Sequence, residues 1–232
     1  MNSHQLRAVF ATVMLLGVGL VESAELAGKI ALGVKVDDPI AVIDGLTARA
    51  GFGDDEVFFV SWTVPLDGSA DVAAVDAVRE TGAQPWLRVV FSSPAPLADH
   101  LGALGRELAE LAGIVREAGD RIFVQAVWRP ESGTPTAKDY GYLIKRAAVV
   151  VTGAAAQAEF AAGPLPSDPA VLEKLYADEV AAYLDVLVLA PTTEAVSAME
   201  ALTVLDPGKP VAVDAVVLAD KSSSAVGEVA AW

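Results

Sequence analysis

Short apolar runs alternate along the chain with longer segments in which apolar residues recur every three to four positions. The clearest helical stripe places leucines and a valine at positions 101, 104, 108, 111 and 115. The apolar runs predict strands over residues 29–37, 56–62, 84–91, 121–128, 157–163, 184–190 and 210–218. The intervening segments predict helices over residues 39–50, 69–81, 101–115, 136–151, 168–183 and 192–205.

Strict alternation of strands and helices predicts an α/β fold with parallel strands, either an open doubly wound sheet or a closed (β/α)₈ barrel. The first strand runs into Val36-Asp37-Asp38-Pro39 and lacks the glycine-rich turn of a dinucleotide-binding fold. We therefore expect a TIM-barrel-like domain over residues 25–232, with about seven βα units that neighbour one another in chain order.

The predicted barrel is short of its usual length. A complete barrel takes about 250 residues, and a seventh helix would only begin near Trp232. We expect the eighth unit to be missing because the chain is part of a longer polypeptide. The alternative is a shortened barrel whose open sheet edge must be covered.

Residues 1–24 have the layout of a secretory signal peptide. Arg7 supplies a positive amino-terminal region, and residues 9–21 form an apolar run that is short for a membrane span. Cleavage is expected after Ser23 or Ala24, which predicts a secreted or periplasmic protein without a membrane span after processing. The alternative is an uncleaved anchor.

The amino-acid composition limits which catalytic and metal-binding groups the protein can use. The chain has no cysteine and two histidines, His4 and His100, so thiol nucleophiles and thiolate or imidazole metal clusters are excluded, and nothing implies a cofactor. Any catalysis is expected to use carboxylates. The formal net charge of −15 disfavours nucleic acid and anionic membranes as partners and favours a neutral ligand.

Glu131 is the first candidate for a functional carboxylate. Gln125, Val127, Arg129 and Glu131 share one side of the fourth predicted strand if no bulge intervenes. A glutamine within an apolar strand suggests that this side faces the barrel interior. Glu131 would then point into the mouth, where barrel enzymes hold their reactive groups. Alternatively, it simply opens a surface loop.

Other polar and aromatic residues interrupt or end the predicted strands. Lys35, Asp37 and Arg88 are candidates to orient a substrate, or else form an internal ion-pair network. Trp62 and Trp128 end their strands, where an indole can stack on a sugar ring. Both indoles could equally be packed in the core.

Asp214 is the one acid in the apolar run of the seventh predicted strand, which makes it the natural partner of Glu131. Two such carboxylates, about 5–5.5 Å apart, serve as acid/base and nucleophile in retaining glycosidases. The alternative is an aspartate held by backbone donors or a lysine.

Several segments resemble the clan of retaining glycoside hydrolases with a (β/α)₈ barrel, particularly its cellulase-like and xylosidase-like members. The family's Trp-Asn-Glu-Pro after the fourth strand corresponds to Trp128-Arg129-Pro130-Glu131. The tyrosine-containing helix and the approach to the sixth strand correspond to residues 139–143, 172–176 and 183–186. The family's His-Pro-Tyr reads Ala190-Pro191-Thr192 here, and its second glutamate falls near Asp214 or Ala215.

This resemblance implies a secreted domain that acts on or binds carbohydrate, with Glu131 as acid/base and Asp214 as nucleophile. Without a gap the catalytic glutamate aligns with Pro130, so Glu131 takes that role only if the strand end shifts by one residue. Lys35, Asp37, Trp62, Arg88, Trp128 and Arg129 are then the expected substrate-binding residues. The competing hypotheses are a non-catalytic glycan-binding relative and a structural amino-terminal domain.

Overall fold

One curved sheet forms the centre of the molecule. The computed structural model describes residues 16–17, 32–35, 39–40, 58–67, 73–166, 168–190, 192 and 195–213. The strands are β1 (Leu16–Gly17), β2 (Leu32–Lys35), β3 (Phe58–Val64), β4 (Gln84–Phe91), β5 (Phe123–Trp128), β6 (Glu159–Leu165), β7 (Val186–Leu189) and β8 (Val211–Val213). The helices are α2 (Ala74–Glu80), α3 (Leu101–Ala118), α4 (Ala137–Ala154), α5 (Pro169–Ala177) and α6 (Ala195–Leu205), with 3-10 turns η1 (Leu97–Asp99) and η2 (Ala181–Tyr183).

The strands follow chain order across the sheet. Each strand from β2 to β8 pairs in parallel with the next, and β1 adds an antiparallel edge to β8. An open doubly wound sheet would reverse its order, so the expected parallel arrangement in chain order is confirmed. Within the described residues, no pairing joins β2 to β1 or β8 and closes the sheet.

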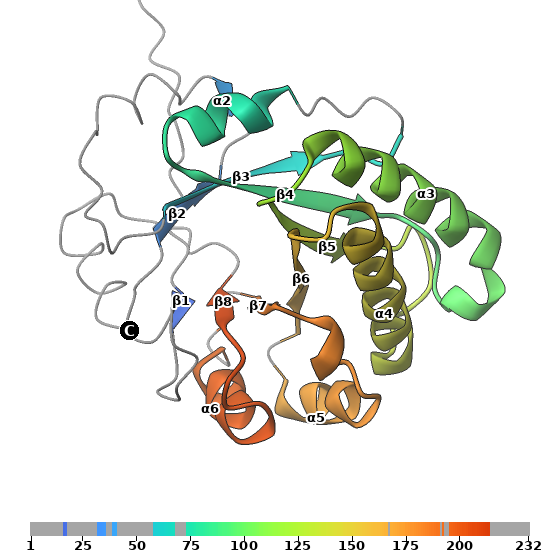
Figure 1. The fold of residues 1–232 in the computed structure, drawn as a ribbon. Helices are drawn as coiled ribbons and strands as arrows, with labels where there is room; N and C mark the ends of the chain where they lie inside the picture. The colour runs from blue at the N-terminus through green and yellow to red at the C-terminus, as the bar shows by residue number, and fades with distance from the viewer. Residues whose placement is uncertain are drawn as a thin grey trace, which may run out of the picture.

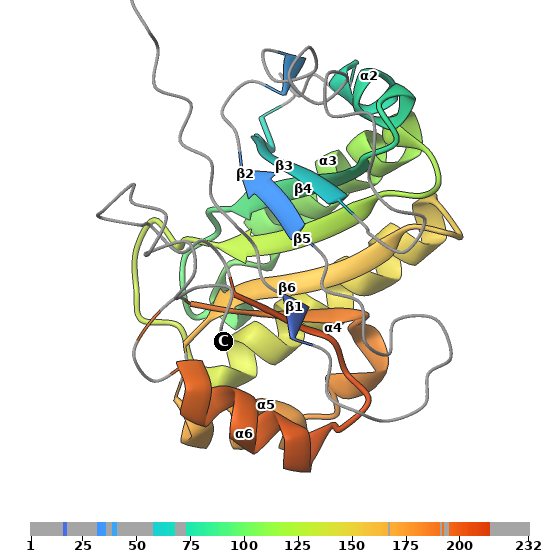
Figure 2. The ribbon, with the colours of Figure 1, turned by 90° about the vertical axis from the view of Figure 1, so that its left-hand side faces the viewer.

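The described helices pack on one face of the sheet, the convex side in Figures 1 and 2. That face and the helices share one apolar core, to which the strands contribute Val60, Trp62, Leu87, Val89, Val124, Ala126, Phe160 and Leu187. The opposite face carries a second cluster made of strand residues alone: Phe59, Trp86, Phe123, Ala161, Val186, Val188 and Ala212. Helices confined to one face fit a barrel-like α/β architecture.

Three aromatic rings and one amide pack together on the concave face. Trp86 stacks on Phe123 with ring centres 5.1 Å apart, and Phe59 meets both rings edge-on. The Trp86 Nε1 group donates to Gln125 Oε1 (2.9 Å), and Gln125 Nε2 donates to the Gly163 carbonyl (2.8 Å). Gln125 therefore lies on the concave face of the sheet, and both ends of its amide are hydrogen-bonded there.

The helix starts follow local capping chemistry. Thr136 caps α4 in a capping box with Asp139, and Asp168 caps α5 by accepting from Ala170 N, with proline at the first helical position. The expected extension of α5 to residue 183 is wrong, because the helix ends at Ala177 and Glu179 takes a positive φ of 57°.

Two further expectations need correction or fall outside the described residues. Leu101 is 51% exposed, so the buried stripe of α3 begins at Leu104. The helix expected over residues 39–50 lies almost entirely outside the described residues.

The strand β1 lies inside the predicted signal peptide, where Leu16 and Gly17 pair with Ala212 and Val211 of β8. A chain cleaved near residue 24 would lack this strand. Among the described helices, none combines the length and apolar composition needed to cross a membrane.

Gly163 is a position where the fold requires glycine. The residue has a φ of 130°, lies where the β6–β7 register shifts, and would bring a Cβ into collision with the Val188 carbonyl oxygen. We expect Gly163→Ala to destabilise the protein by about 2 kcal/mol or more. Gly113→Ala in the middle of α3, where a Cβ meets nothing within 4 Å, is the control and should stabilise by up to about 1 kcal/mol. Urea unfolding of both variants tests this, and equal stability of the two would contradict it.

Asp139 joins the start of α4 to η1. Its carboxylate accepts hydrogen bonds from Thr136 Oγ1, Thr136 N and Leu97 N. Burial opposes ionisation, but these hydrogen bonds, helped by the charge of Lys138, outweigh it and lower the pKa of Asp139 below its usual value. The ionised group is therefore more favourable in the folded protein than in the unfolded chain.

A lowered folded pKa makes this stabilisation complete above the unfolded pKa of about 3.9 and progressively lost as pH falls below it. Asp139→Asn should cost about 1–2 kcal/mol at neutral pH, since a capping acceptor is lost. Below about pH 4 the difference in melting temperature between wild type and variant should shrink. A difference that stays constant from pH 7 to pH 3 would show that the charge of Asp139 contributes nothing.

Candidate functional site

The loops that follow β4 and β5 are hydrogen-bonded to each other beyond the ends of these strands. Arg129 N donates to Phe91 O (2.8 Å), Glu131 N to Ser92 O (2.9 Å), and Ala95 N to Ser132 O (2.9 Å). From the first of these bonds to the second, the donor moves two residues along the chain, from Arg129 to Glu131, while the acceptor moves one, from Phe91 to Ser92. One extra residue on one side of a strand pair is the irregularity that characterises a β-bulge. This places Glu131 at the carboxyl edge of the sheet.

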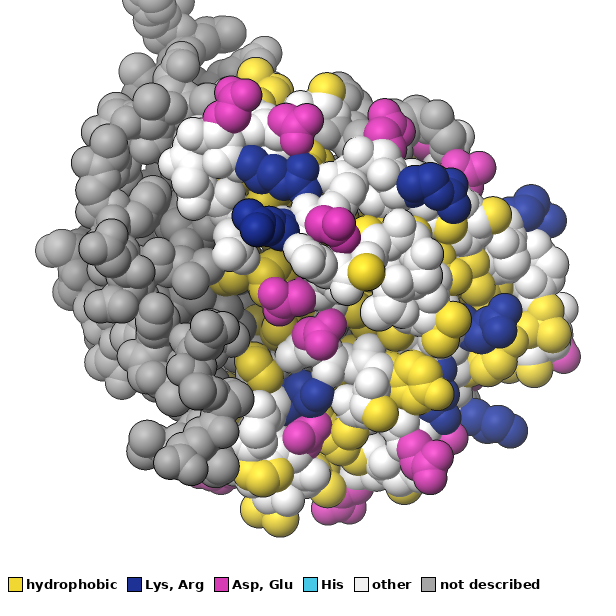
Figure 3. Space-filling view, viewed as in Figure 1, with side chains coloured by type: hydrophobic (Ala, Val, Ile, Leu, Met, Phe, Trp, Pro, Cys, Tyr) yellow, Lys and Arg dark blue, Asp and Glu magenta, His cyan; other side chains and the backbone are white. Residues whose placement is uncertain are grey.

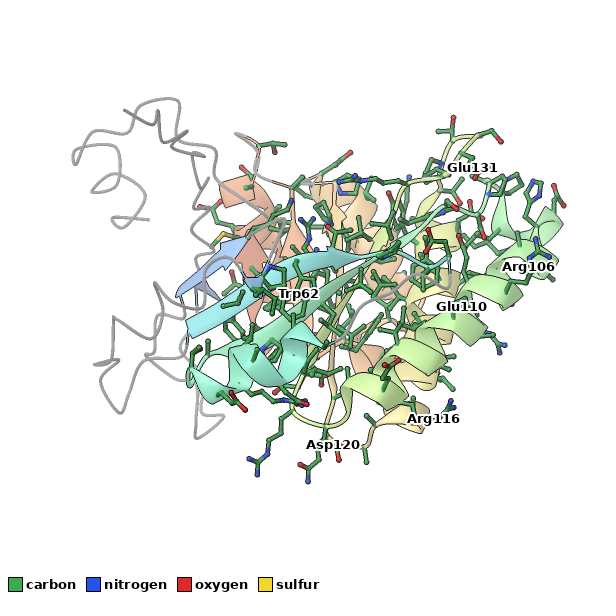
Figure 4. All side chains as sticks on the ribbon, turned by 90° about the horizontal axis from the view of Figure 1, so that it is seen from above. Trp62, Arg106, Glu110, Arg116, Asp120 and Glu131 are labelled. Atoms are coloured by element: carbon green, nitrogen blue, oxygen red, sulfur yellow. The ribbon has the colours of Figure 1, made fainter. Side chains whose placement is uncertain are left out.

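A hollow of about 370 Å³ opens at this edge. Its lining comes from the ends of β3 and β4, the loop after β5 and the first half of α3: Leu66, Asp67, Ser92, Ser93, Pro94, Ala103, Arg106, Glu107, Glu110 and Glu131. Figure 4 shows Glu131, Arg106 and Glu110 together at the end where β4 and β5 finish, with Arg116 and Asp120 toward the other end of α3. The hollow is open, and seven of its ten lining residues are polar or charged.

Three side chains in the hollow are exposed and make no hydrogen bond or ion pair with the described residues: Arg106, Glu110 and Glu131. A guanidinium supplies hydrogen-bond donors and carboxylates supply acceptors, so the hollow offers both kinds of group. Glu107 differs from them, because its carboxylate already accepts hydrogen bonds from Ser92 and Ser93.

Four of the expected binding residues do not line the hollow beside Glu131. The lining of its hollow includes α3 residues but neither Lys35, Arg88 nor either tryptophan. The expectation that Glu131 continues the face of Gln125 assumed an unbroken strand, and the irregularity after Trp128 removes that assumption. Arg129 is exposed on the same loop. Asp37 and Asp214 lie outside the described residues.

Lys35 and Arg88 belong to the concave side of the sheet. Arg88 is 1% exposed and lies in register with Thr63 and Gln125, while half-buried Lys35 lies in register with Ser61. Each of these two residues makes at least one interaction. Their role in binding a substrate stays a prediction.

Trp62 and Trp128 belong to the helix-facing core, where they are 3% and 7% exposed. Trp128 Nε1 donates to Ser93 O (2.9 Å), and its ring meets Tyr140 edge-on with centres 5.1 Å apart. This arrangement gives neither indole the exposed face that stacking on a sugar requires. Core packing describes both residues in this structure.

Sequence reasoning missed the contribution of α3, namely Arg106, Glu107 and Glu110, and the Ser92-Ser93 pair. The two serines and Pro94 directly after a buried strand are a turn signal that could have drawn attention to this loop. The α3 residues carried no such signal, because charged residues on an exposed helical face are ordinary.

Other polar features lie away from the hollow. Burial, and then the charge of Asp185, raise the pKa of Glu159 at the start of β6. A second hollow of about 620 Å³, with Lys138 and Lys174 in its lining, lies between α4 and α5. Within the described part of the chain no cluster of His, Asp and Glu side chains could hold a metal ion. Acidic and basic side chains are interspersed over the described surface in Figure 3.

Comparisons with known proteins identify a shared fold. No protein-family profile matches the sequence, and no curated protein matches it. The structure is similar to that of a family 39 glycoside hydrolase from the gut symbiont Bacteroides cellulosilyticus WH2, with a TM-score of 0.51 and 18% sequence identity. The match covers 68% of this chain and 37% of the hydrolase chain, so the chain corresponds to about a third of that protein's length. At this level of sequence identity the similarity concerns the fold alone.

Proposed function

We propose that this protein is a glycoside-hydrolase-like domain that binds carbohydrate at the carboxyl edge of its sheet. The observation that carries the proposal is the polar hollow beside Glu131, at the ends of β3, β4 and β5, in a fold shared with a glycoside hydrolase. Proteins of this architecture use the loops at this edge for their ligands.

The chemistry of the hollow supports a neutral polyhydroxylated ligand. Glu110 and Glu131 offer acceptors for sugar hydroxyl groups, and Arg106 offers donors. With a net charge of −15, the chain as a whole repels anionic ligands more than neutral ones. Cello- and xylo-oligosaccharides are the first ligands to test.

Hydrolysis of a glycosidic bond is the second candidate function. It is favoured by the position of Glu131 after β5, the fourth strand in the parallel series that begins at β2, and by Asp214 directly after β8. A separation of about 5–5.5 Å between their carboxyl groups would suit a retaining mechanism. The exposure of Glu131 and its place beside α3 favour binding over catalysis.

We further propose that the curved sheet is part of a (β/α)₈ barrel. The support is the parallel pairing in chain order from β2 to β8 and the helices on a single face. In such a barrel Lys35 and Arg88 would line the interior below the mouth.

Replacing Glu131 tests both functions. If the protein binds glycans through this carboxylate, Glu131→Gln should weaken affinity for cello- or xylo-oligosaccharides about tenfold, the loss of a hydrogen bond to a charged group. If it hydrolyses aryl glycosides, the same change should slow turnover by about 10²–10⁴-fold. Calorimetric titration and an aryl-glycoside panel provide the measurements.

Glu173→Gln, an exposed change on α5, is the matched control and should leave both values unchanged. Asp214→Asn, with thermal melts to verify folding, separates the functions, because it should abolish turnover but not binding. Wild-type protein without affinity for any glycan and without turnover would refute the proposal.

We also propose that the protein is exported and loses residues 1 to about 24, since Arg7 and the short apolar run precede small residues at Ser23 and Ala24. Mass spectrometry of protein recovered after expression in an exporting host should show a new amino terminus near residue 24. Intact Met1 in the membrane fraction would indicate an anchor, and intact Met1 in a soluble cytoplasmic fraction would leave β1 in the mature fold.

A further inference from the structure

One carboxylate of α3 organises the turn that lies beneath the hollow. Glu107 Oε1 accepts hydrogen bonds from Ser92 N (2.6 Å), Ser92 Oγ (2.9 Å) and Ser93 N (3.1 Å). Glu107 Oε2 accepts from Ser93 Oγ. Four donors from two consecutive serines thus converge on one charged group, and charge-assisted hydrogen bonds of this kind are stronger than neutral ones.

The same two serines use their carbonyl oxygens in the opposite direction. Ser92 O accepts from Glu131 N (2.9 Å), and Ser93 O accepts from Trp128 Nε1 (2.9 Å). Each serine therefore donates to α3 and accepts from the segment that ends β5. The turn connects Glu107 to Glu131 without direct contact between the two carboxylates.

The side chain of Glu131 has no other support among the described residues. It is exposed and makes no hydrogen bond or ion pair there, so its position depends on its backbone. That backbone is fixed on one side by the Ser92 carbonyl. A shift of the Ser92–Ser93 turn would therefore also shift the Glu131 carboxylate, the candidate ligand-binding group.

We propose that Glu107 is a positioning residue for the candidate site. Glu107 holds the Ser92–Ser93 turn, and the carbonyl groups of Ser92 and Ser93 in turn hold the Glu131 backbone and the Trp128 indole. The structural part of this inference stands on hydrogen bonds alone. Its meaning for ligand binding rests on the proposed function of Glu131.

The charge of Glu107 is what a glutamine lacks. Two backbone N–H groups and two hydroxyl groups donate to the carboxylate, and with an NH₂ group in place of one oxygen the Ser93 hydroxyl would have to turn and accept. Glu107→Gln therefore keeps the size of the side chain and replaces charge-assisted hydrogen bonds by weaker neutral ones. Glu117→Gln, a change of the same kind on the exposed side of α3 farther from the hollow, is the matched control.

Amide hydrogen exchange followed by NMR tests the structural part on the intact protein. In Glu107→Gln we expect exchange at Glu131 N–H and Trp128 Nε1–H to become about tenfold faster, as when charge-assisted hydrogen bonds are lost, with little change in the strand interiors. Glu117→Gln should match wild type. Unchanged exchange at both groups would overturn the proposal.

If Glu107→Gln does not fold, Ser93→Ala removes a single donor to Glu107 and should still speed exchange at Trp128 Nε1–H, and no effect there would also overturn the proposal. Affinity for cello- and xylo-oligosaccharides, measured on the same samples, should fall with the loss of protection at Glu131. If Glu107→Gln shows faster exchange but unchanged affinity, and Glu131→Gln also has normal affinity, the positioning role of Glu107 is confirmed and the proposed glycan site is refuted.

Discussion

The backbone ladder between β4 and β5 continues past the ends of both strands, and the candidate site depends on this continuation. The hydrogen bonds from Arg129 N to Phe91 O and from Glu131 N to Ser92 O join two loops into one edge. Loops at the carboxyl edge of parallel strands are usually the variable and mobile parts of a fold. Here the two loops are bonded to each other and to helices. Glu107 of α3 holds the loop after β4, and Asp139 at the start of α4 accepts a hydrogen bond from Leu97 in the same β4–α3 connection.

The concave face below this edge is stabilised in a different way. Three aromatic rings pack together there, and the amide of Gln125 links Trp86 to the Gly163 carbonyl by two hydrogen bonds. Gly163 allows the close approach of β6 to β7 because a side chain there would meet Val188 O. The packed interior and the hydrogen-bonded edge together hold the backbone from which the exposed side chains of the hollow project.

The alternation of strands and helices, and the bounds of β4, could be predicted because parallel strands read as continuous apolar runs. The same property hides which side of a strand faces the helices. For this reason the sequence leaves both sugar stacking and core packing open for Trp62 and Trp128, and the structure places both in the helix-facing core. The irregularity after Trp128 was equally hidden, since it depends on hydrogen bonds to Phe91 and Ser92, nearly forty residues earlier in the sequence. Glu107 could not be recognised because its partners become neighbours only when β4 and α3 pack together.

The most direct test of a carbohydrate site at this edge is an NMR titration of the ¹⁵N-labelled protein with xylohexaose and cellohexaose. The account predicts that the largest shifts occur at the backbone amides of Ser92, Ser93, Arg106 and Glu131, around the hollow at the ends of β4 and β5. Shifts concentrated at Lys138 and Lys174, in the hollow between α4 and α5, would contradict it, as would an absence of shifts at millimolar ligand.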